Sequence, residues 1–223
     1  MLSITEENYL KQILGHKLEF ESEEGIGTNE LAGRLSVKPS SVHVMLKKLR
    51  DKNLIDYEKY GKIHLTKSGQ DYAMQIVRKH RLWETFLYEK LDFTWDEVHE
   101  VAEQLEHIQS PKLVEKLDKF LEHPDTDPHG DPIPDKTGKI KRIKKELLSR
   151  AEVGKTYKMV AVKDNSAAFL SYLQDLGIGI NKIIHVVSRL EFDQSMEIQV
   201  AGKSIRVSKL FSDNVFVVLN KKD

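Results

Sequence analysis

The chain has 223 residues, 39% of them hydrophobic, with 35 Lys and Arg balancing 35 Asp and Glu, and it has no cysteine. This length allows one to three domains with sizeable cores, and the composition is typical of a soluble globular protein. Without cysteine there can be no disulfide, no thiolate-ligated zinc and no thiol nucleophile. No apolar run approaches the roughly 18 residues that a membrane helix needs, and the acidic N-terminus lacks a secretory pattern, so we expect a cytoplasmic protein without a membrane partner.

The zero net charge is the sum of blocks of opposite sign. Residues 34–67 hold nine bases and three acids, a net charge of +6, and residues 136–150 hold seven bases and one acid, also +6. Residues 84–131 hold four bases and fourteen acids, a net charge of −10, together with four histidines. This arrangement suggests a polyanion as one ligand and a cation as another, although solvated helix faces would give the same pattern.

The first third of the chain has the pattern of a winged helix-turn-helix. Apolar residues at helical spacing predict a helix over 5–20, and Thr28 is a candidate cap for a short helix over 29–35. Pro39 followed by two serines predicts the start of a helix that runs to about residue 52. Two short strands are then expected, over 55–60 and 62–66, around a glycine-containing turn.

This order of elements places the third helix where it can enter the major groove of double-stranded DNA. Small hydroxyls and an imidazole near its start can approach phosphates and base edges, and lysines can neutralise phosphates. The alternative is a helical domain with a basic, solvated face. The predicted DNA contacts are Lys38, Ser40, Ser41, His43, Lys47 and Lys62.

The acidic middle of the chain is predicted to be helical, with metal-ligand residue types on shared faces. A long helix over 67–91 carries His80 and Glu84 one turn apart. A capping-box pattern at residues 94–97 opens the next helix, expected to reach about residue 108, before a further helix over 111–121. One side of the second of these helices carries His99, Glu103, Glu106 and His107.

Imidazoles and carboxylates without thiolates suit Mn²⁺ or Fe²⁺, and Zn²⁺ or Co²⁺ would also bind such a set in vitro. The alternative is that these residues merely populate a wet helix face. The spacing therefore predicts a divalent-metal site without excluding the solvated face.

Several motifs together resemble the diphtheria toxin repressor family of metal-dependent regulators, in particular its manganese-responsive branch. The resemblance covers nearly the whole chain. Its marks are Glu7-Asn8-Tyr9-Leu10, Lys38-Pro39-Ser40-Ser41-Val42, Arg78-Lys79-His80-Arg81-Leu82-Trp83-Glu84, the stretch from Val98 to His107, and Asp127-Pro128-His129-Gly130.

The resemblance implies a homodimeric repressor in which a winged helix binds a DNA operator and a middle domain pairs two chains and holds metal. It implies a regulatory metal site at Glu103, Glu106 and His107, with Asn8 contributed by the first helix. Glutamate at position 103, where iron-responsive members have cysteine, favours manganese. For a second site the resemblance implies His80, Glu84 and His99, and in some relatives the positions of Asp127, His129 and Asp164.

The last third of the chain is predicted to be a small barrel. A Pro-, Asp- and Gly-rich loop over 125–138 leads into a basic connector, and β-rich runs begin after Val153, interrupted by one helix over 167–176 that Gly177 ends. Gly154-Lys155-Thr156-Tyr157 and Leu176-Gly177-Ile178 resemble the SH3-like domain of this family and of ferrous-iron transport accessory proteins.

The expected fold is therefore mainly α with a small β part: a winged helix (1–70), a helical metal-binding and dimerisation domain (71–150) and an SH3-like domain (151–223). The expected function is a DNA-binding repressor, not an enzyme, that senses Mn²⁺ or Fe²⁺ and controls metal-uptake genes. Three alternatives stay open at this point: a winged-helix regulator that responds to a small organic ligand, a metal-dependent hydrolase, and an interaction module for metal transport.

Overall fold

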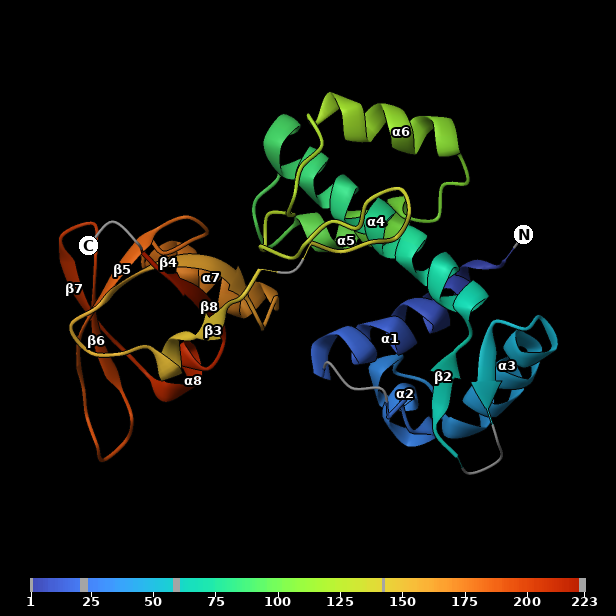
Figure 1. Ribbon diagram of the computed structural model, residues 1–223, viewed down its shortest axis with the longest axis horizontal. Coiled ribbons are helices and arrows are strands. Elements are labelled where there is room, and N and C mark those ends of the chain that lie inside the picture. Colours follow the sequence, from blue (N-terminus) through green and yellow to red (C-terminus); the bar gives the residue numbers. More distant parts are fainter. Residues whose placement is uncertain (1, 21–23, 58–60, 142, 221–223) are drawn as a thin grey trace. The chain divides into compact units, whose positions relative to one another are not determined.

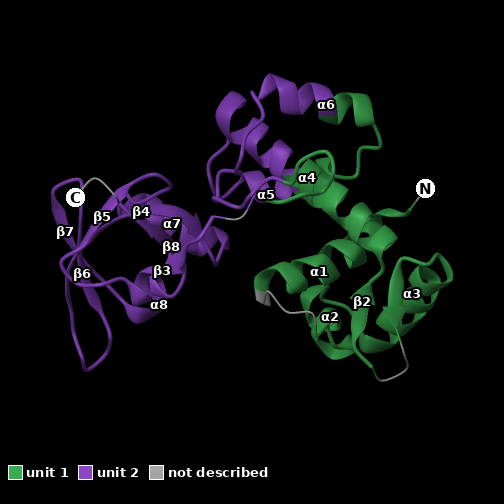
Figure 2. Ribbon diagram, in the orientation of Figure 1, with its two compact units in different colours: residues 1–80, 103–114, 134–140 green, residues 81–102, 115–133, 141–223 purple. Residues whose placement is uncertain are grey.

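The computed structural model of the chain describes residues 2–20, 24–57, 61–141 and 143–220. The described chain divides into two compact units, shown in green and purple in Figure 2. The first unit comprises residues 1–80, 103–114 and 134–140, and the second comprises residues 81–102, 115–133 and 141–223. The division between the units falls within three helices, α4 (Lys67–Lys90), α5 (Val98–Leu105) and α6 (Pro111–Phe120). The three domain boundaries expected from the sequence stay a prediction.

The first unit begins with the predicted winged helix-turn-helix. Its elements are α1 (Ile4–Phe20), α2 (Thr28–Arg34), α3 (Pro39–Asp51), β1 (Ile55–Tyr57) and β2 (Ile63–Leu65). Leu10, Leu14, Leu31, Leu46 and Ile63 are fully buried in one core, which is why the three helices and the hairpin pack together. The strands pair antiparallel, and the predicted strand residues 58–60 lie outside the described residues.

The two predicted helix starts in this unit have different outcomes. Pro39 stands in the first turn of α3, as predicted, where its missing N–H costs no hydrogen bond. The prediction that Thr28 caps α2 is wrong. Gly27 is the N-cap, with extended backbone angles, and Thr28 is already helical.

Three helices follow: α4 (Lys67–Lys90), α5 (Val98–Leu105) and α6 (Pro111–Phe120). The predicted capping contact is present, since the Thr94 amide donates to Glu97 at 2.8 Å. However, α5 is shorter than predicted, because Glu106 and His107 lie in a turn in which the Ile108 amide bonds to the Leu105 carbonyl. Such a turn keeps nearly the spacing of a helix, so the sequence pattern could not show where α5 ends.

The C-terminal part of the second unit is a six-stranded antiparallel sheet, coloured from yellow to red in Figure 1. Its strands follow the order β3-β8-β4-β5-β6-β7. Their bounds are Glu146–Leu147 (β3), Thr156–Val162 (β4), Ile183–Arg189 (β5), Met196–Val200 (β6), Lys203–Val207 (β7) and Val215–Leu219 (β8). Register shifts in the β4–β8 and β5–β6 pairs bend these strands.

Short helices accompany this sheet: the 3₁₀ turn η1 (Leu148–Arg150), α7 (Ala167–Asp175) and α8 (Lys209–Ser212). Tyr157, Met159, Leu170 and Phe211 are among the buried residues of its core. Gly177 follows α7 with a φ of +69°, so the predicted role of this glycine in ending the helix is confirmed. No helix in the described part of the chain is long and apolar enough to cross a membrane.

Candidate metal centres and DNA-contact surface

The first candidate metal centre, here called the first cluster, lies in the first unit and consists of Glu7, Asn8, Lys11, His80, Glu103, Glu106 and His107. Helix α1 supplies the first three, α4 supplies His80, and α5 and the turn after it supply the rest. The cluster therefore joins the first helix of the winged helix to the helices that follow it.

Short contacts run through the first cluster. Nδ1 of His80 lies 2.6 Å from an oxygen of Glu106, which is fully buried. Since a carboxylate can only accept, the imidazole donates this hydrogen bond. Nδ1 of His107 lies 2.6 Å from Oε2 of Glu7, and the Gln109 amide donates to the other Glu7 oxygen. Nζ of Lys11 donates to both Glu103 and Glu106.

Two oxygen atoms at this cluster are buried without a hydrogen-bond partner in the described residues: Oδ1 of Asn8 and Oε1 of Glu106. Leaving a buried polar atom unpaired costs roughly 1–3 kcal/mol, and more for a charged group. A divalent cation bound at these oxygens would remove that cost, and the donor set of carboxylate, imidazole and amide fits such an ion.

Lys79 adds positive charge near the first cluster. Burial lowers the pKa of its ammonium, while the nearby carboxylates of Glu7 and Glu106 oppose that shift. The electrostatics of the cluster therefore involve two lysines of the chain as well as its acids.

The second candidate centre, here called the second cluster, lies in the second unit and consists of Glu84, His99, Asp127 and His129. Glu84, Asp127 and His129 are all buried and present ligand atoms within 4.8 Å of one another. Nδ1 of His99 lies 3.0 Å from Glu84, and Nδ1 of His129 lies 3.7 Å from the same Glu84 oxygen. Two carboxylates and two imidazoles thus converge without a thiolate.

The ring of His129 is held in a defined orientation. Its Nε2 donates to the carbonyl oxygen of Trp95 at 3.0 Å, and the two rings stack with centroids 5.8 Å apart. Nδ1 faces Glu84 at 3.7 Å. In the neutral imidazole Nδ1 carries the lone pair that a metal ion would take, because Nε2 is the donor. Fixing a ligand in this way by a backbone carbonyl is usual around metal-binding histidines.

The carboxyl group of Asp127 is strongly perturbed. Burial, and after it the Glu84 carboxylate, raises the pKa of Asp127 to about 8. Burial also opposes the charged form of His129, but the neighbouring carboxylates of Glu84 and Asp127 raise its pKa overall. The carboxylates of Asp127 and Glu84 repel each other because both are buried away from water. A bound cation would reduce this repulsion.

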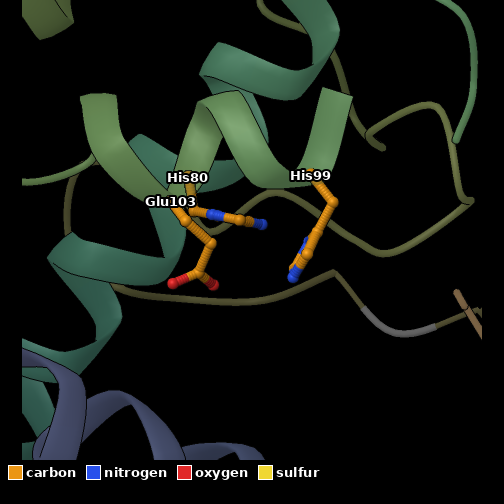
Figure 3. Close-up of side chains that lie close together, drawn as sticks. All are labelled: His80, His99 and Glu103. Carbon is orange, nitrogen blue, oxygen red and sulfur yellow. The ribbon is translucent and has the colours of Figure 1, made fainter. Parts of the chain in front are cut away.

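The structure thus gathers nine of the ten predicted metal ligands into two groups. Figure 3 shows His80 and Glu103 beside each other, with His99 one turn before Glu103 on α5. The tenth, Asp164, accepts a hydrogen bond from the Ser166 amide before α7 and is not among the described residues that gather around Glu84. A metal role for any of the ten stays a prediction.

Two members of the first cluster, Glu7 and Lys11, were not among the candidates from the sequence. They lie one turn apart on α1, on either side of Asn8, so their position next to an expected ligand was a signal that could have found them.

The predicted DNA contacts lie on α3, at its N-cap and just before β2. Lys38, Ser40, Ser41, His43 and Lys47, at the N-cap or within α3, are all exposed, and so is Lys62 just before β2. Nδ1 of His43 lies 3.0 Å from the Tyr57 hydroxyl, which limits the directions its ring can take. The buried side of the same helix carries Val42, Leu46 and Leu49.

Comparison with known proteins assigns the parts of the chain to described domains. Residues 1–63 match the N-terminal DNA-binding domain of iron-dependent repressors, and residues 66–135 match their metal-binding and dimerisation domain. Residues 146–219 match the FeoA domain. A solved manganese-dependent transcriptional repressor in complex with manganese is 32% identical, with a TM-score of 0.86, over 96% of this chain and 100% of its own. The chain belongs to the iron-dependent repressor family.

Two curated relatives match parts of this repressor-family chain. The iron-dependent repressor IdeR of Mycobacterium tuberculosis is 33% identical over 132 residues, which are 58% of this chain and 55% of IdeR. A probable metal transport system membrane protein of Chlamydia trachomatis is 45% identical over 75 residues, which are 34% of this chain and 17% of that protein. The chain thus spans about half of the first relative and a small part of the second.

The family assignment confirms the resemblance and the fold class expected from the sequence. The matched family consists of transcriptional repressors, in agreement with the expectation that the chain is not an enzyme. The family assignment also accounts for the winged helix, for which the hydrolase alternative gives no reason.

Proposed function

We propose that the chain is a repressor that binds DNA when a divalent metal, Mn²⁺ or alternatively Fe²⁺, occupies the first cluster. The observation that carries this proposal is the composition of that cluster: α1 of the winged helix meets the following helical region twice. Lys11 contacts His80 and Glu106, and Glu7 contacts His107. A metal bound to ligands from all these segments would restrain the DNA-reading part of the first unit.

The metal acts here by linkage. If it favours one arrangement of the winged helices among several, it raises DNA affinity, and DNA must raise metal affinity by the same factor. A coupling free energy of about 1–3 kcal/mol is ordinary for such a system. The ligands that we assign to this ion are Asn8, Glu103, Glu106 and His107. We add His80, which the resemblance implied for the second site, because its Nδ1 lies 2.6 Å from Glu106. The second cluster would hold another ion through Glu84, His99, Asp127 and His129, with Asp164 as a further candidate.

The absence of thiolates supports manganese, with iron as the other physiological candidate and Zn²⁺ or Co²⁺ as substitutes in vitro. The manganese-dependent repressor named above supports the same assignment by its similarity to this chain. Metal-uptake genes are the targets that fit a repressor that the metal activates.

We further propose a homodimer on a near-palindromic operator, in the cytoplasm. The exposed apolar side chains of Tyr88, Leu91 and Phe120 at the end of α4 and on α6 would lie in the dimer contact. Two recognition helices α3 roughly 34 Å apart would then match successive major grooves on one face of the duplex.

A gel-shift titration on a selected operator tests the proposal. The wild-type chain is expected to shift the operator with Mn²⁺ and not with chelator, whereas Glu103→Ala is expected to lose the Mn²⁺-dependent shift. Equal operator binding in all lanes would contradict control by metal. It would favour the alternative of a winged-helix regulator that responds to a small organic ligand.

Replacing Lys47 is expected to weaken DNA binding by its charge alone. Lys47 is exposed on α3 and can neutralise a phosphate. Lys47→Ala should therefore weaken binding to all sequences alike and reduce the slope of log affinity against log salt by about 1. Fluorescence anisotropy at several salt concentrations measures this slope. An unchanged slope would show that Lys47 does not contact DNA.

A further inference from the structure

The first cluster contains a cation that belongs to the chain itself. Nζ of Lys11 lies 2.6 Å from Oε1 of Glu103 and 2.5 Å from Oε2 of Glu106. It also lies 3.1 Å from Nδ1 of His80. The Lys11 side chain is only 13% exposed, so this ammonium is largely withdrawn from water.

The partners of Lys11 are the side chains to which the proposed function assigns the metal. A divalent ion at Oε1 of Glu106 would share this carboxylate with the Lys11 ammonium, which contacts Oε2. Two cations on the same buried carboxylates repel each other strongly, because little water screens their charges. Lys11 therefore opposes a divalent ion between Glu103 and Glu106 as long as it keeps both of its contacts.

The charges explain why Lys11 occupies this position. Glu7 is 7% exposed and Glu106 is fully buried, and Glu103 adds a third carboxylate to the same cluster. Buried acids repel one another unless a cation lies between them. Lys11 supplies one positive charge where a divalent ion would supply two.

We propose that Lys11 is an internal competitor of the metal ion. Its ammonium holds Glu103 and Glu106 in the metal-free chain, and a divalent ion displaces it. Lys11 thereby weakens metal binding and raises the metal concentration at which the chain responds. This inference rests on the proposed function of the first cluster.

Metal binding to Lys11→Leu tests the competition. Leucine removes the charge and, unlike methionine, offers no sulfur ligand. The variant is compared with its parent in a Glu84→Gln background, which weakens the second cluster, and Mn²⁺ binding is measured by competition with a fluorescent chelator. Lys11→Leu is expected to bind Mn²⁺ at least about tenfold more tightly, because the ion no longer displaces a bound cation.

Lys52→Leu is the matched control. Lys52 also pairs with a buried acid of α1, donating to Glu6 at 2.6 Å, but Glu6 is outside the first cluster. Its replacement removes the same charge and should leave Mn²⁺ affinity unchanged within about twofold. Unchanged or weaker affinity in Lys11→Leu would overturn the proposal.

A second measurement on the wild-type chain does not depend on a variant that folds. Reductive methylation of lysines, followed by mass spectrometry, reports how accessible each ammonium is. The rate at Lys11 is expected to rise several-fold when Mn²⁺ is added, while the rate at Lys52 stays constant. Tight Mn²⁺ binding with an unchanged rate at Lys11 would refute the competition and leave the proposed function intact. A wild-type chain that binds no Mn²⁺ would refute both.

Discussion

Glu106→Gln is expected to weaken Mn²⁺ binding at the first cluster by at least about 100-fold and to abolish metal-dependent DNA binding. Substituting groups that merely orient metal ligands costs 10–100-fold, so the loss of a ligand charge should cost at least the upper value. Glutamine keeps the size of the side chain and an acceptor oxygen for Nδ1 of His80, which lies 2.6 Å from the present carboxylate. The change thus removes the charge with little change in packing.

Glu115→Gln is the control for this variant, because it removes the same charge from an exposed position on α6. Mn²⁺ affinity is measured by calorimetry, and operator binding by anisotropy with saturating Mn²⁺. If Glu106→Gln loses no more affinity than Glu115→Gln, the first cluster is not the metal centre that controls DNA binding. Thermal melting of the metal-free variants shows whether both are folded.

The sequence predicted the helices of the winged helix, the long α4 and most of the strands because periodicity and turn residues are local signals. It also predicted the histidines of both clusters, and every glutamate in them except Glu7, as candidates. These predictions came from the spacing of residues along and just after α4 and α5 and from the family resemblance. The physical basis of that success is that residues three or four apart on a helix share a face.

Contacts between residues far apart in the sequence could not be predicted from local sequence patterns. Lys11 meets residues 92 and 95 positions away, and only the packing of α1 against α4 and α5 decides that contact. The same is true of Glu7, which meets His107 at a separation of 100 residues. The end of α5 at Leu105 was missed for a different reason. The turn that follows keeps almost helical spacing, so the sequence pattern continues past the last helical residue.

The loop that carries Asp127 and His129 also depends on a distant contact. The amide of Val162 in β4 donates to the His129 carbonyl at 3.1 Å, so the loop is attached to the sheet of the second unit. The sequence showed a Pro-, Asp- and Gly-rich loop, but nothing in it indicated which strand the loop would contact. Gly130 lies at that contact and permits it.

Gly130→Ala is expected to destabilise the chain by about 2–5 kcal/mol and to remove Mn²⁺ from the second cluster alone. Gly130 has a φ of +85°, and a Cβ atom there would lie 1.9 Å from the carbonyl oxygen of Val160 and 2.6 Å from Cα of Ala161. Since the obstacle is backbone, either the loop or β4 must move. His129 precedes Gly130 directly, so its ring would leave Glu84.

Gly154→Ala separates the clash from backbone strain. Gly154 has a similar φ of +81°, but a Cβ atom there would meet nothing within 4 Å. Its replacement should therefore cost only the strain of a left-handed residue, about 1–2 kcal/mol. Chemical denaturation measures both costs, and calorimetry is expected to show one Mn²⁺ site lost in Gly130→Ala and none in Gly154→Ala. Equal costs and equal Mn²⁺ stoichiometry in the two variants would mean that the loop does not need its contact with β4 to hold the second cluster together.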